Sequence, residues 1–225
     1  MAGEKAEAAS SVSHPAPRRG PIVDFFQLLD EPQQPWLDPD ALKRKFLALS
    51  ASAHPDRFHT ASAAEREMAD RHYAELNAAW QCLRDPKERL RHLLELERGA
   101  PPTDIQRVPP ELTDRFFAVG RLCREATIFL EEKAKISSPL MKAQLFVRGA
   151  EWADQLLAMQ QQINRSREDL LAELAAMNPA WANAMATSPA QKPLLLERLE
   201  EIHRLLGYFG RWSEQLQERI VQLTL

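Results

Sequence analysis

Several features that mark common protein classes are scarce or missing in this sequence. It has seven glycines in 225 residues, which argues against a turn-rich β fold. No stretch approaches the roughly twenty consecutive apolar residues of a membrane-spanning helix. Residues 1–20 lack the apolar middle of a secretory signal. The net charge of −3 gives no general reason to expect nucleic acid or an anionic membrane as a partner.

Residues that support metal, redox or nucleotide chemistry are also few. The two cysteines, Cys82 and Cys123, stand singly within helical patterns, which is typical of buried thiols in a reducing compartment. There is no CxxC motif, no Cys/His cluster and no glycine-rich phosphate loop. We therefore expect a cytoplasmic protein that holds no metal or other cofactor and does not itself bind ATP.

The stretch that organises the chain is the tripeptide His54-Pro55-Asp56. A short amphipathic helix precedes it, with Leu42, Phe46 and Leu49 on one face. A second helical pattern follows over residues 63–83. Two helices joined by a rigid loop can pack antiparallel, and proline stiffens the loop because it fixes φ. The pattern predicts a helical hairpin that presents a histidine and an aspartate at its tip.

This arrangement resembles the J-domain, the module with which DnaJ-type co-chaperones stimulate ATP hydrolysis by a DnaK-type chaperone. The segments that carry the resemblance are Asp24 to Leu29, Asp40 to Ala53, His54-Pro55-Asp56 and Glu65 to Arg84. The stretch from Asn77 through Trp80 and Asp85-Pro86 to Gly99 is more specifically similar to the HscB-like co-chaperones of iron–sulfur cluster assembly. The likeness is specific over about residues 23–99 and architectural beyond them.

The resemblance implies an all-α, L-shaped protein in which a J-domain hairpin precedes a three-helix antiparallel bundle. Residues 1–20 are rich in Ala, Ser and Pro, and this composition predicts a disordered tail. We assign residues 21–99 to the J-domain, residues 100–110 to a linker that begins with Ala-Pro-Pro, and residues 111–225 to the bundle.

In the bundle, three apolar stripes at helical spacing predict three helices that bury one another. The first stripe runs from Leu112 through Phe116 and Val119 to Leu130. The second begins at Pro139 and is expected to end at Asn178-Pro179, because proline disfavours helix in the residue before it. A loop containing Pro189 and Pro193 is expected to lead to the third.

The chaperone-binding residues implied by the resemblance surround the tripeptide. His54-Pro55-Asp56 would dock on the ATPase, and the basic side chains Lys43, Arg44, Lys45 and Arg57 would meet its carboxylates. Taken alone, the basic run is more typical of a solvated helix face, but its place next to His54-Pro55-Asp56 favours the docking role. One departure from the family is Ser50 to Ala53, where J-domains often carry more basic side chains.

The client-binding surface implied by the resemblance lies on the first bundle helix, where HscB-like proteins present apolar and acidic residues. Here the apolar character remains, and Leu112, Phe116 and Phe117 are the candidate client-binding residues. Most of the acids are missing from this stretch and appear later, at Glu125, Glu131 and Glu132. Phe117 lies off the core stripe, so it either anchors a client or packs on the J-domain or linker.

Three functional hypotheses remain open. The first is a co-chaperone that delivers an iron–sulfur cluster scaffold protein to a DnaK-type ATPase, and the second is a J-domain co-chaperone for another client. The third is an adaptor with a J-like fold that does not stimulate the ATPase. An enzyme is disfavoured, because no activated Ser, Cys or Lys with a positioned base accompanies His54 and Asp56.

Overall fold

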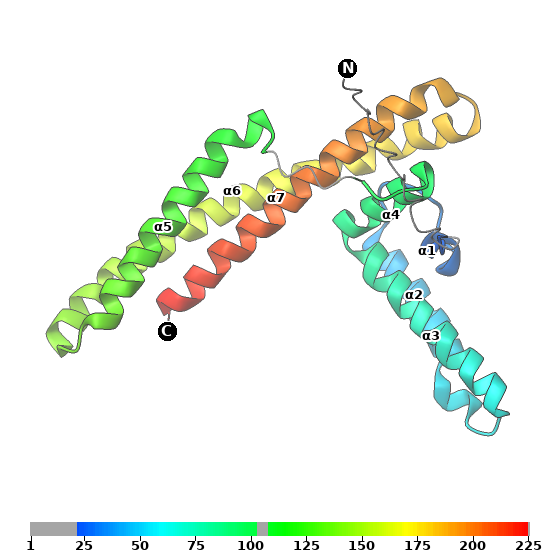
Figure 1. The fold of residues 1–225 in the computed structure, drawn as a ribbon, viewed down its shortest axis with the longest axis horizontal. Helices are drawn as coiled ribbons and strands as arrows, with labels where there is room; N and C mark the ends of the chain where they lie inside the picture. The colour runs from blue at the N-terminus through cyan, green and yellow to red at the C-terminus, as the bar shows by residue number, and fades with distance from the viewer. Residues whose placement is uncertain (1–21, 103–107, 225) are drawn as a thin grey trace, which may run out of the picture.

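The computed structural model describes residues 22–102 and 108–224. The tail predicted for residues 1–20 and the middle of the predicted linker lie outside these ranges. The described residues are helical without a strand, as expected. Figure 1 shows two arms that spread from a common corner, which gives the molecule the L shape implied by the family resemblance.

One arm is the predicted hairpin. Its elements and their neighbours are α1 (Phe25–Leu28), α2 (Pro39–Ala53), the 3-10 turn η1 (Pro55–Phe58), α3 (Ala63–Arg84) and α4 (Pro86–Arg98). Local capping defines the start of α2, because the Asp38 carboxylate accepts the backbone N–H groups of Asp40 and Ala41. A reciprocal capping box between Ser62 and Glu65 starts α3. The tip between α2 and α3 lies at the free end of this arm (Figure 1).

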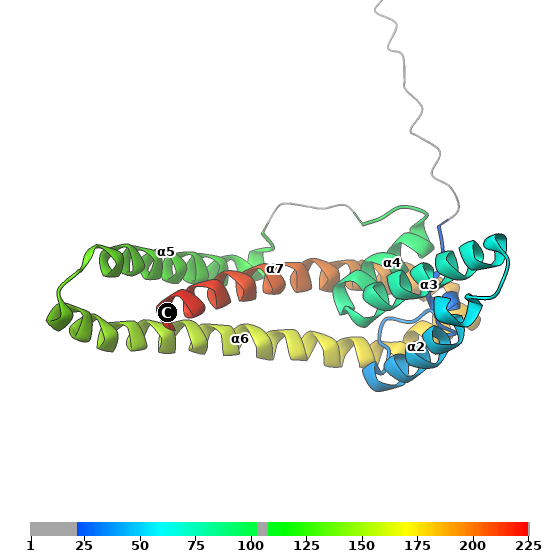
Figure 2. The ribbon, with the colours of Figure 1, turned by 90° about the horizontal axis from the view of Figure 1, so that it is seen from below.

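The other arm is the bundle, made of α5 (Thr113–Lys135), α6 (Pro139–Ala186) and α7 (Lys192–Thr224), with short 3-10 turns η2 (Pro110–Leu112) and η3 (Pro189–Gln191). The most extensive pairing is between α6 and α7, and α5 packs against both. Figure 2 shows α7 returning between α5 and α6, so the three predicted helices form an antiparallel bundle.

The predicted end of the second bundle helix is wrong. Instead of stopping at Asn178-Pro179, α6 continues through Pro179 to Ala186. Proline inside a helix removes one backbone hydrogen bond and crowds the preceding turn. Here long-range contacts hold the continuation in place: the Asn178 amide and the Trp181 indole both bind the loop that precedes α2. Trp181 is also 1% exposed, so burial adds to these bonds.

The corner joins the two arms through α4 and α7, which pack against each other. Two ion pairs cross this contact, Arg98 with Glu200 and Lys192 with Glu97. The buried apolar side chains of the described residues form one continuous cluster that includes Leu93 of α4. The two arms therefore share a core.

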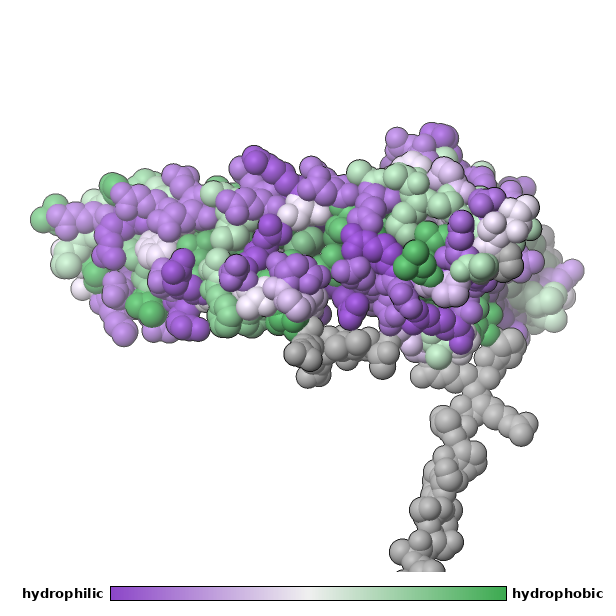
Figure 3. Space-filling model, turned by 90° about the horizontal axis from the view of Figure 1, so that it is seen from above, coloured by the Kyte–Doolittle hydropathy of each residue, from purple (hydrophilic) through white to green (hydrophobic). Residues whose placement is uncertain are grey.

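The surface carries apolar side chains only in patches. On the face seen in Figure 3 they are interrupted by charged and polar groups along the whole length of the molecule. In the described part of the chain, no helix is long and apolar enough to cross a membrane.

Candidate functional site

The tripeptide His54-Pro55-Asp56 occupies the tip of the hairpin arm. Helix α2 ends at Ala53, which is buried, and His54 leaves the helix in an extended conformation. Pro55 then starts η1, where its fixed φ suits a first helical position. The Asp56 backbone N–H donates to Nδ1 of His54 over 3.3 Å, so the histidine caps the turn that carries the aspartate.

This bond determines which part of the His54 ring faces outward. In the neutral imidazole, a nitrogen that accepts a hydrogen bond carries no proton, so the ring proton lies on Nε2. The Asp56 Oδ2 atom also lies 3.5 Å from Nδ1, but that ion pair requires a proton on Nδ1 and excludes the backbone bond. The ring meets Tyr73 of α3 edge to face, with centroids 5.3 Å apart. The loop therefore offers an N–H donor with a fixed orientation.

Asp56 is the most accessible group of the tripeptide. Its side chain is 91% exposed, against 46% for His54. Its backbone carbonyl lies 2.8 Å from Nδ1 of His59, which ties the turn together without using the carboxylate. A donor on His54 and an exposed carboxylate on Asp56 thus lie side by side at the tip. Arg57 is exposed as well, and its Nη1 makes only a long contact of 3.5 Å to the Ala51 carbonyl.

The three basic residues of α2 differ in their availability. Lys43 and Arg44 are exposed. Lys45 is tied to the loop before α2, because its ammonium donates to the Asp30 carbonyl and lies 3.2 Å from a Glu31 carboxylate oxygen. The Glu31 side chain is only 10% exposed. The Lys45 ammonium thus pairs with a largely enclosed carboxylate within the arm, while its side chain is 40% exposed, and its place on the chaperone-binding surface stays a prediction.

One exposed residue of α2 was missed by the sequence analysis. Leu47 is 53% exposed and follows Lys43 by one helical turn. It falls outside the stripe of Leu42, Phe46 and Leu49, and that position was the available signal. The stripe itself behaves as predicted: Leu42 is buried, and Phe46 stacks on Trp80 of α3 with centroids 4.9 Å apart. The exposed face of α2 is thus partly apolar as well as basic.

The candidate client-binding residues separate into two groups. Leu112 is 5% exposed and lies in the core, so it is corrected from a docking contact to a packing residue. Phe116 and Phe117 are 42% and 66% exposed, and their rings meet edge to face. Phe116 is more exposed than its place in the predicted stripe implies, because the buried stretch of α5 begins only at Val119, about one turn later. Among the described residues, Phe117 is not packed on the hairpin arm.

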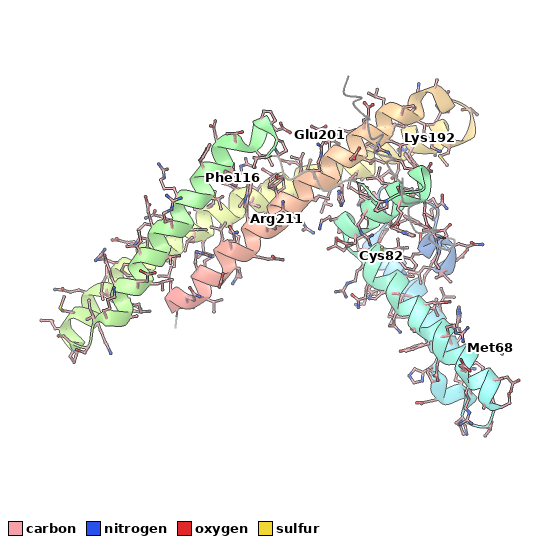
Figure 4. The ribbon with its side chains drawn as sticks, in the orientation of Figure 1. Met68, Cys82, Phe116, Lys192, Glu201 and Arg211 are labelled. Atoms are coloured by element: carbon pink, nitrogen blue, oxygen red, sulfur yellow. The ribbon has the colours of Figure 1, made fainter. Side chains whose placement is uncertain are left out.

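The two phenylalanines lie far from the tripeptide. Figure 4 shows Phe116 on α5 of the bundle, whereas Met68, on the hairpin arm, lies towards the opposite end of the molecule. The acids that appear later in α5 are exposed, and Glu132 lies 3.9 Å from Arg148 of α6. The fold therefore presents a polar loop and an aromatic surface on separate arms.

The described residues also bear on metal and thiol chemistry. No cluster of three or more His, Cys, Asp or Glu side chains within residues 22–102 and 108–224 is arranged to hold a metal ion. Both cysteines are buried, as predicted, and burial raises the pKa of the Cys82 thiol to about 11.

Comparison with known proteins gives a consistent picture. No family model matches the chain. A co-chaperone protein HscB homologue of Bordetella pertussis is 46% identical over 72 residues, which are 32% of this chain and 42% of that protein. The chain thus matches less than half the length of this relative. A co-chaperone protein HscB homologue of Cupriavidus taiwanensis is 30% identical over 179 residues, covering 79% of this chain and 89% of that protein.

A solved structure agrees at the level of the fold. The chaperone HscB from Vibrio cholerae superimposes with a TM-score of 0.56 and 23% identity, over 87% of this chain and 96% of that one. This likeness supports the fold, in which a helical hairpin arm precedes a helical bundle.

Proposed function

The chain belongs to the HscB family of co-chaperones, and from that premise we propose that it stimulates the ATPase of a DnaK-type chaperone and delivers an iron–sulfur cluster scaffold protein to it. The observation that carries the first half is the exposed His54-Pro55-Asp56 tip, held by the bond from the Asp56 N–H to His54. The separate aromatic surface on α5 supports the second half.

The stimulation we propose is a differential binding effect. A co-chaperone can shift its partner towards a hydrolysis-competent state only if it binds that state better than the other. In our proposal the His54 Nε2–H donates to the partner, and the Asp56 carboxylate accepts a charge-assisted hydrogen bond from a partner cation. Lys43, Arg44 and Arg57 add steering towards an acidic partner surface. The chain itself has no enzymatic role in this scheme, which we place in the cytoplasm.

Client capture is assigned to the bundle. Exposed, mutually packed aromatic side chains are the residues most often found at the energetic centre of an interface. Phe116 and Phe117 meet this description, whereas Leu112 is buried in the core. One observation favours a different client as the second candidate: two arginines, Arg121 and Arg124, and a single acid, Asp114, line the surface beside the aromatic pair.

The decisive experiment replaces His54. The variant His54→Gln removes the imidazole donor from a half-exposed ring, so stability should change little. We expect it to lose stimulation of the purified DnaK-type ATPase from the same organism, with an unchanged circular dichroism spectrum. His72→Gln is the matched control, because His72 is an exposed histidine of α3 outside the loop. Full stimulation by folded His54→Gln would exclude the proposed role of His54, whereas absence of stimulation by the wild type would favour the adaptor hypothesis.

A further inference from the structure

An open hollow lies on the outer face of α5. Its volume is ≈ 510 Å³, and it is lined by Asp114, Phe116, Phe117, Ala118, Gly120, Arg121 and Arg124. All of these residues belong to one helix, so the hollow is a feature of its surface rather than a gap between helices. Phe116, Gly120 and Arg124 are each four residues apart, so they lie one above another along the helix. The aromatic pair therefore forms one end of the hollow and the arginines form the other.

Gly120 is the reason that the hollow exists. Glycine in a helix interior destabilises it by roughly 0.5–1 kcal/mol relative to alanine. The fold gives no steric reason for this cost, since a Cβ built at Gly120 meets no atom within 4 Å. The glycine is also exposed. The missing side chain leaves room beside the phenylalanines for a group from another molecule.

The charges around the hollow are uneven. Arg121 and Arg124 are exposed, and neither makes an ion pair or hydrogen bond recorded among the described residues. Other arginines of the bundle are engaged: Arg198 binds Glu173 through two bonds, and Arg115 donates to Ser166. The carboxylate that lines the hollow, Asp114, lies in the first turn of α5, where the helix dipole favours it. The arginine end is therefore free to bind anions.

We propose that this hollow receives an apolar side chain of the client from a segment in which carboxylates flank that side chain. The apolar group would fill the space above Gly120 against Phe116 and Phe117, and the carboxylates would pair with Arg121 and Arg124. This inference rests on the proposed client capture and deepens it by specifying the chemistry of the bound segment. The bound segment would therefore be acidic, whereas an acidic docking surface would select a basic segment.

The first test fills the hollow without disturbing the fold. Gly120→Leu should fold at least as stably as the wild type, because leucine favours helix, Gly120 is exposed and a Cβ at this position meets no atom within 4 Å. We expect its affinity for the organism's iron–sulfur cluster scaffold protein, measured by calorimetry with the full chain, to fall at least tenfold. Gly120→Ala is the matched control, since it gains helix propensity but leaves most of the space open. Wild-type affinity in Gly120→Leu would overturn the proposal.

The second test concerns charge. Arg124→Glu should weaken the same complex at least tenfold and remove part of its salt dependence, whereas Arg165→Glu should do neither. Arg165 is an exposed arginine of α6 outside the hollow, so it matches the charge change. Equal effects of the two variants, or tighter binding by Arg124→Glu, would contradict the proposal that the bound segment is acidic.

A third measurement identifies the bound segment directly. A photoreactive group attached to Gly120→Cys should label the scaffold protein at a peptide in which an apolar residue is flanked by Asp or Glu. Labelling should be selective, because Cys82 and Cys123 are buried and burial raises the pKa of both thiols. A labelled peptide without acidic residues would overturn the inference. If the wild-type chain fails to bind the scaffold protein at all, the proposed client itself falls, and this inference falls with it.

Discussion

His92 of α4 is a histidine that the fold uses as a neutral structural group. It is 3% exposed, and its Nε2 accepts the backbone N–H of Phe25 over 3.1 Å. The ring also packs on Phe25 and Phe26, with centroids 4.6 and 5.8 Å away. Burial lowers its pKa below the ordinary value, although the nearby Asp24 and Glu95 carboxylates oppose that shift. Protonation at Nε2 would replace the acceptor with a donor facing another donor.

The lowered pKa of His92 predicts a pH-dependent stability. The unfolded chain takes up this proton as the pH falls through the ordinary value of 6.5, whereas the folded chain does not until a lower pH. The unfolded state therefore binds more protons in that window, and the free energy of unfolding decreases as pH falls. We expect His92→Gln, which keeps an acceptor but cannot titrate, to lose less stability than the wild type between pH 7.5 and 5.5. Urea unfolding of both chains at the two pH values measures the difference, and equal losses would contradict it.

Single residues were predicted well where their own helix decides their environment. The burial of Leu42, Val119 and Cys123 follows from helical periodicity. The contacts of Lys45 could not be predicted, because its partners Asp30 and Glu31 belong to a loop whose position no local pattern gives. The contacts of His92 could not be predicted either, because the helix that covers it, α1, is distant in the sequence.

At the scale of the element, α2 carries cations with different tasks. Lys43 and Arg44 are exposed, so replacing both with alanine should leave the melting temperature nearly unchanged. It should slow association with the ATPase, more strongly at low salt, because exposed charges act mainly through steering. Stopped-flow association rates at several salt concentrations test this. An association rate that is slowed to the same extent at every salt concentration would contradict this prediction.

Lys45→Ala should show the opposite profile. Removing the ammonium leaves the Glu31 carboxylate, which is 10% exposed, without its cation. Loss of one partner from an enclosed polar pair costs about 1–3 kcal/mol. We expect a fall in the free energy of unfolding of this order, measured by urea denaturation, with the association rate little changed. A stable Lys45→Ala variant that associates slowly would instead support its place on the binding surface.

Elements were also predicted wherever local rules suffice. The N-cap of Asp38, the stop at Asp85-Pro86 and the left-handed C-cap of Gly99, with φ 71°, are all local signals. The end of α6 was misplaced because the rule that proline ends a helix is also local. At Pro179 this rule fails, because the helix is held by contacts to residues more than 140 positions away in the sequence.

At the scale of the whole molecule, the loop before α2 is held from two sides. From α4, Arg89 donates to the Pro35 carbonyl over 3.0 Å and to the Leu83 carbonyl over 2.7 Å. Arg89 is 3% exposed, and this burial lowers its pKa to about 10. From α6, the side chain of Asn178 exchanges two bonds with the Trp36 backbone, at 3.1 and 2.9 Å. The corner of the L is thus fixed by specific polar contacts as well as by apolar packing.

The corner bears on the predicted division of the chain. A boundary within residues 100–110 stays a prediction, but the core does not divide there, because α4 packs on α7 and one apolar cluster includes both. Sequence periodicity shows which face of a helix is buried without showing which helix covers it. The part of α7 that faces α4 therefore looked like bundle core. A bundle fragment cut at this boundary would expose surface that α4 covers in the full chain.

The contacts of Asn178 and Trp181 with the α2 loop predict that the angle between the arms is set by the far end of α6. Asn178→Ala removes both bonds to Trp36, and Trp181→Phe removes the 2.8 Å bond to the Gln33 carbonyl while keeping an aromatic ring. These bonds are partly buried, and each lost hydrogen bond costs about 0.5–1.5 kcal/mol, so the double variant should be destabilised yet folded.

We expect the double variant to show a broader distribution of distances between spin labels on α3 and α5, measured by pulsed electron paramagnetic resonance on the full chain. Its stimulation of the ATPase without client should survive, because the His54 loop lies at the other end of the hairpin arm. If the proposed function holds, delivery of the scaffold protein to the ATPase should become less efficient, because the two proposed binding surfaces lie on different arms. Gln160→Ala is the matched control, because it also removes a hydrogen bond made by a side-chain amide of α6, the bond from Gln160 to Gln217 within the bundle. An unchanged distance distribution in a destabilised double variant would assign these contacts to stability alone.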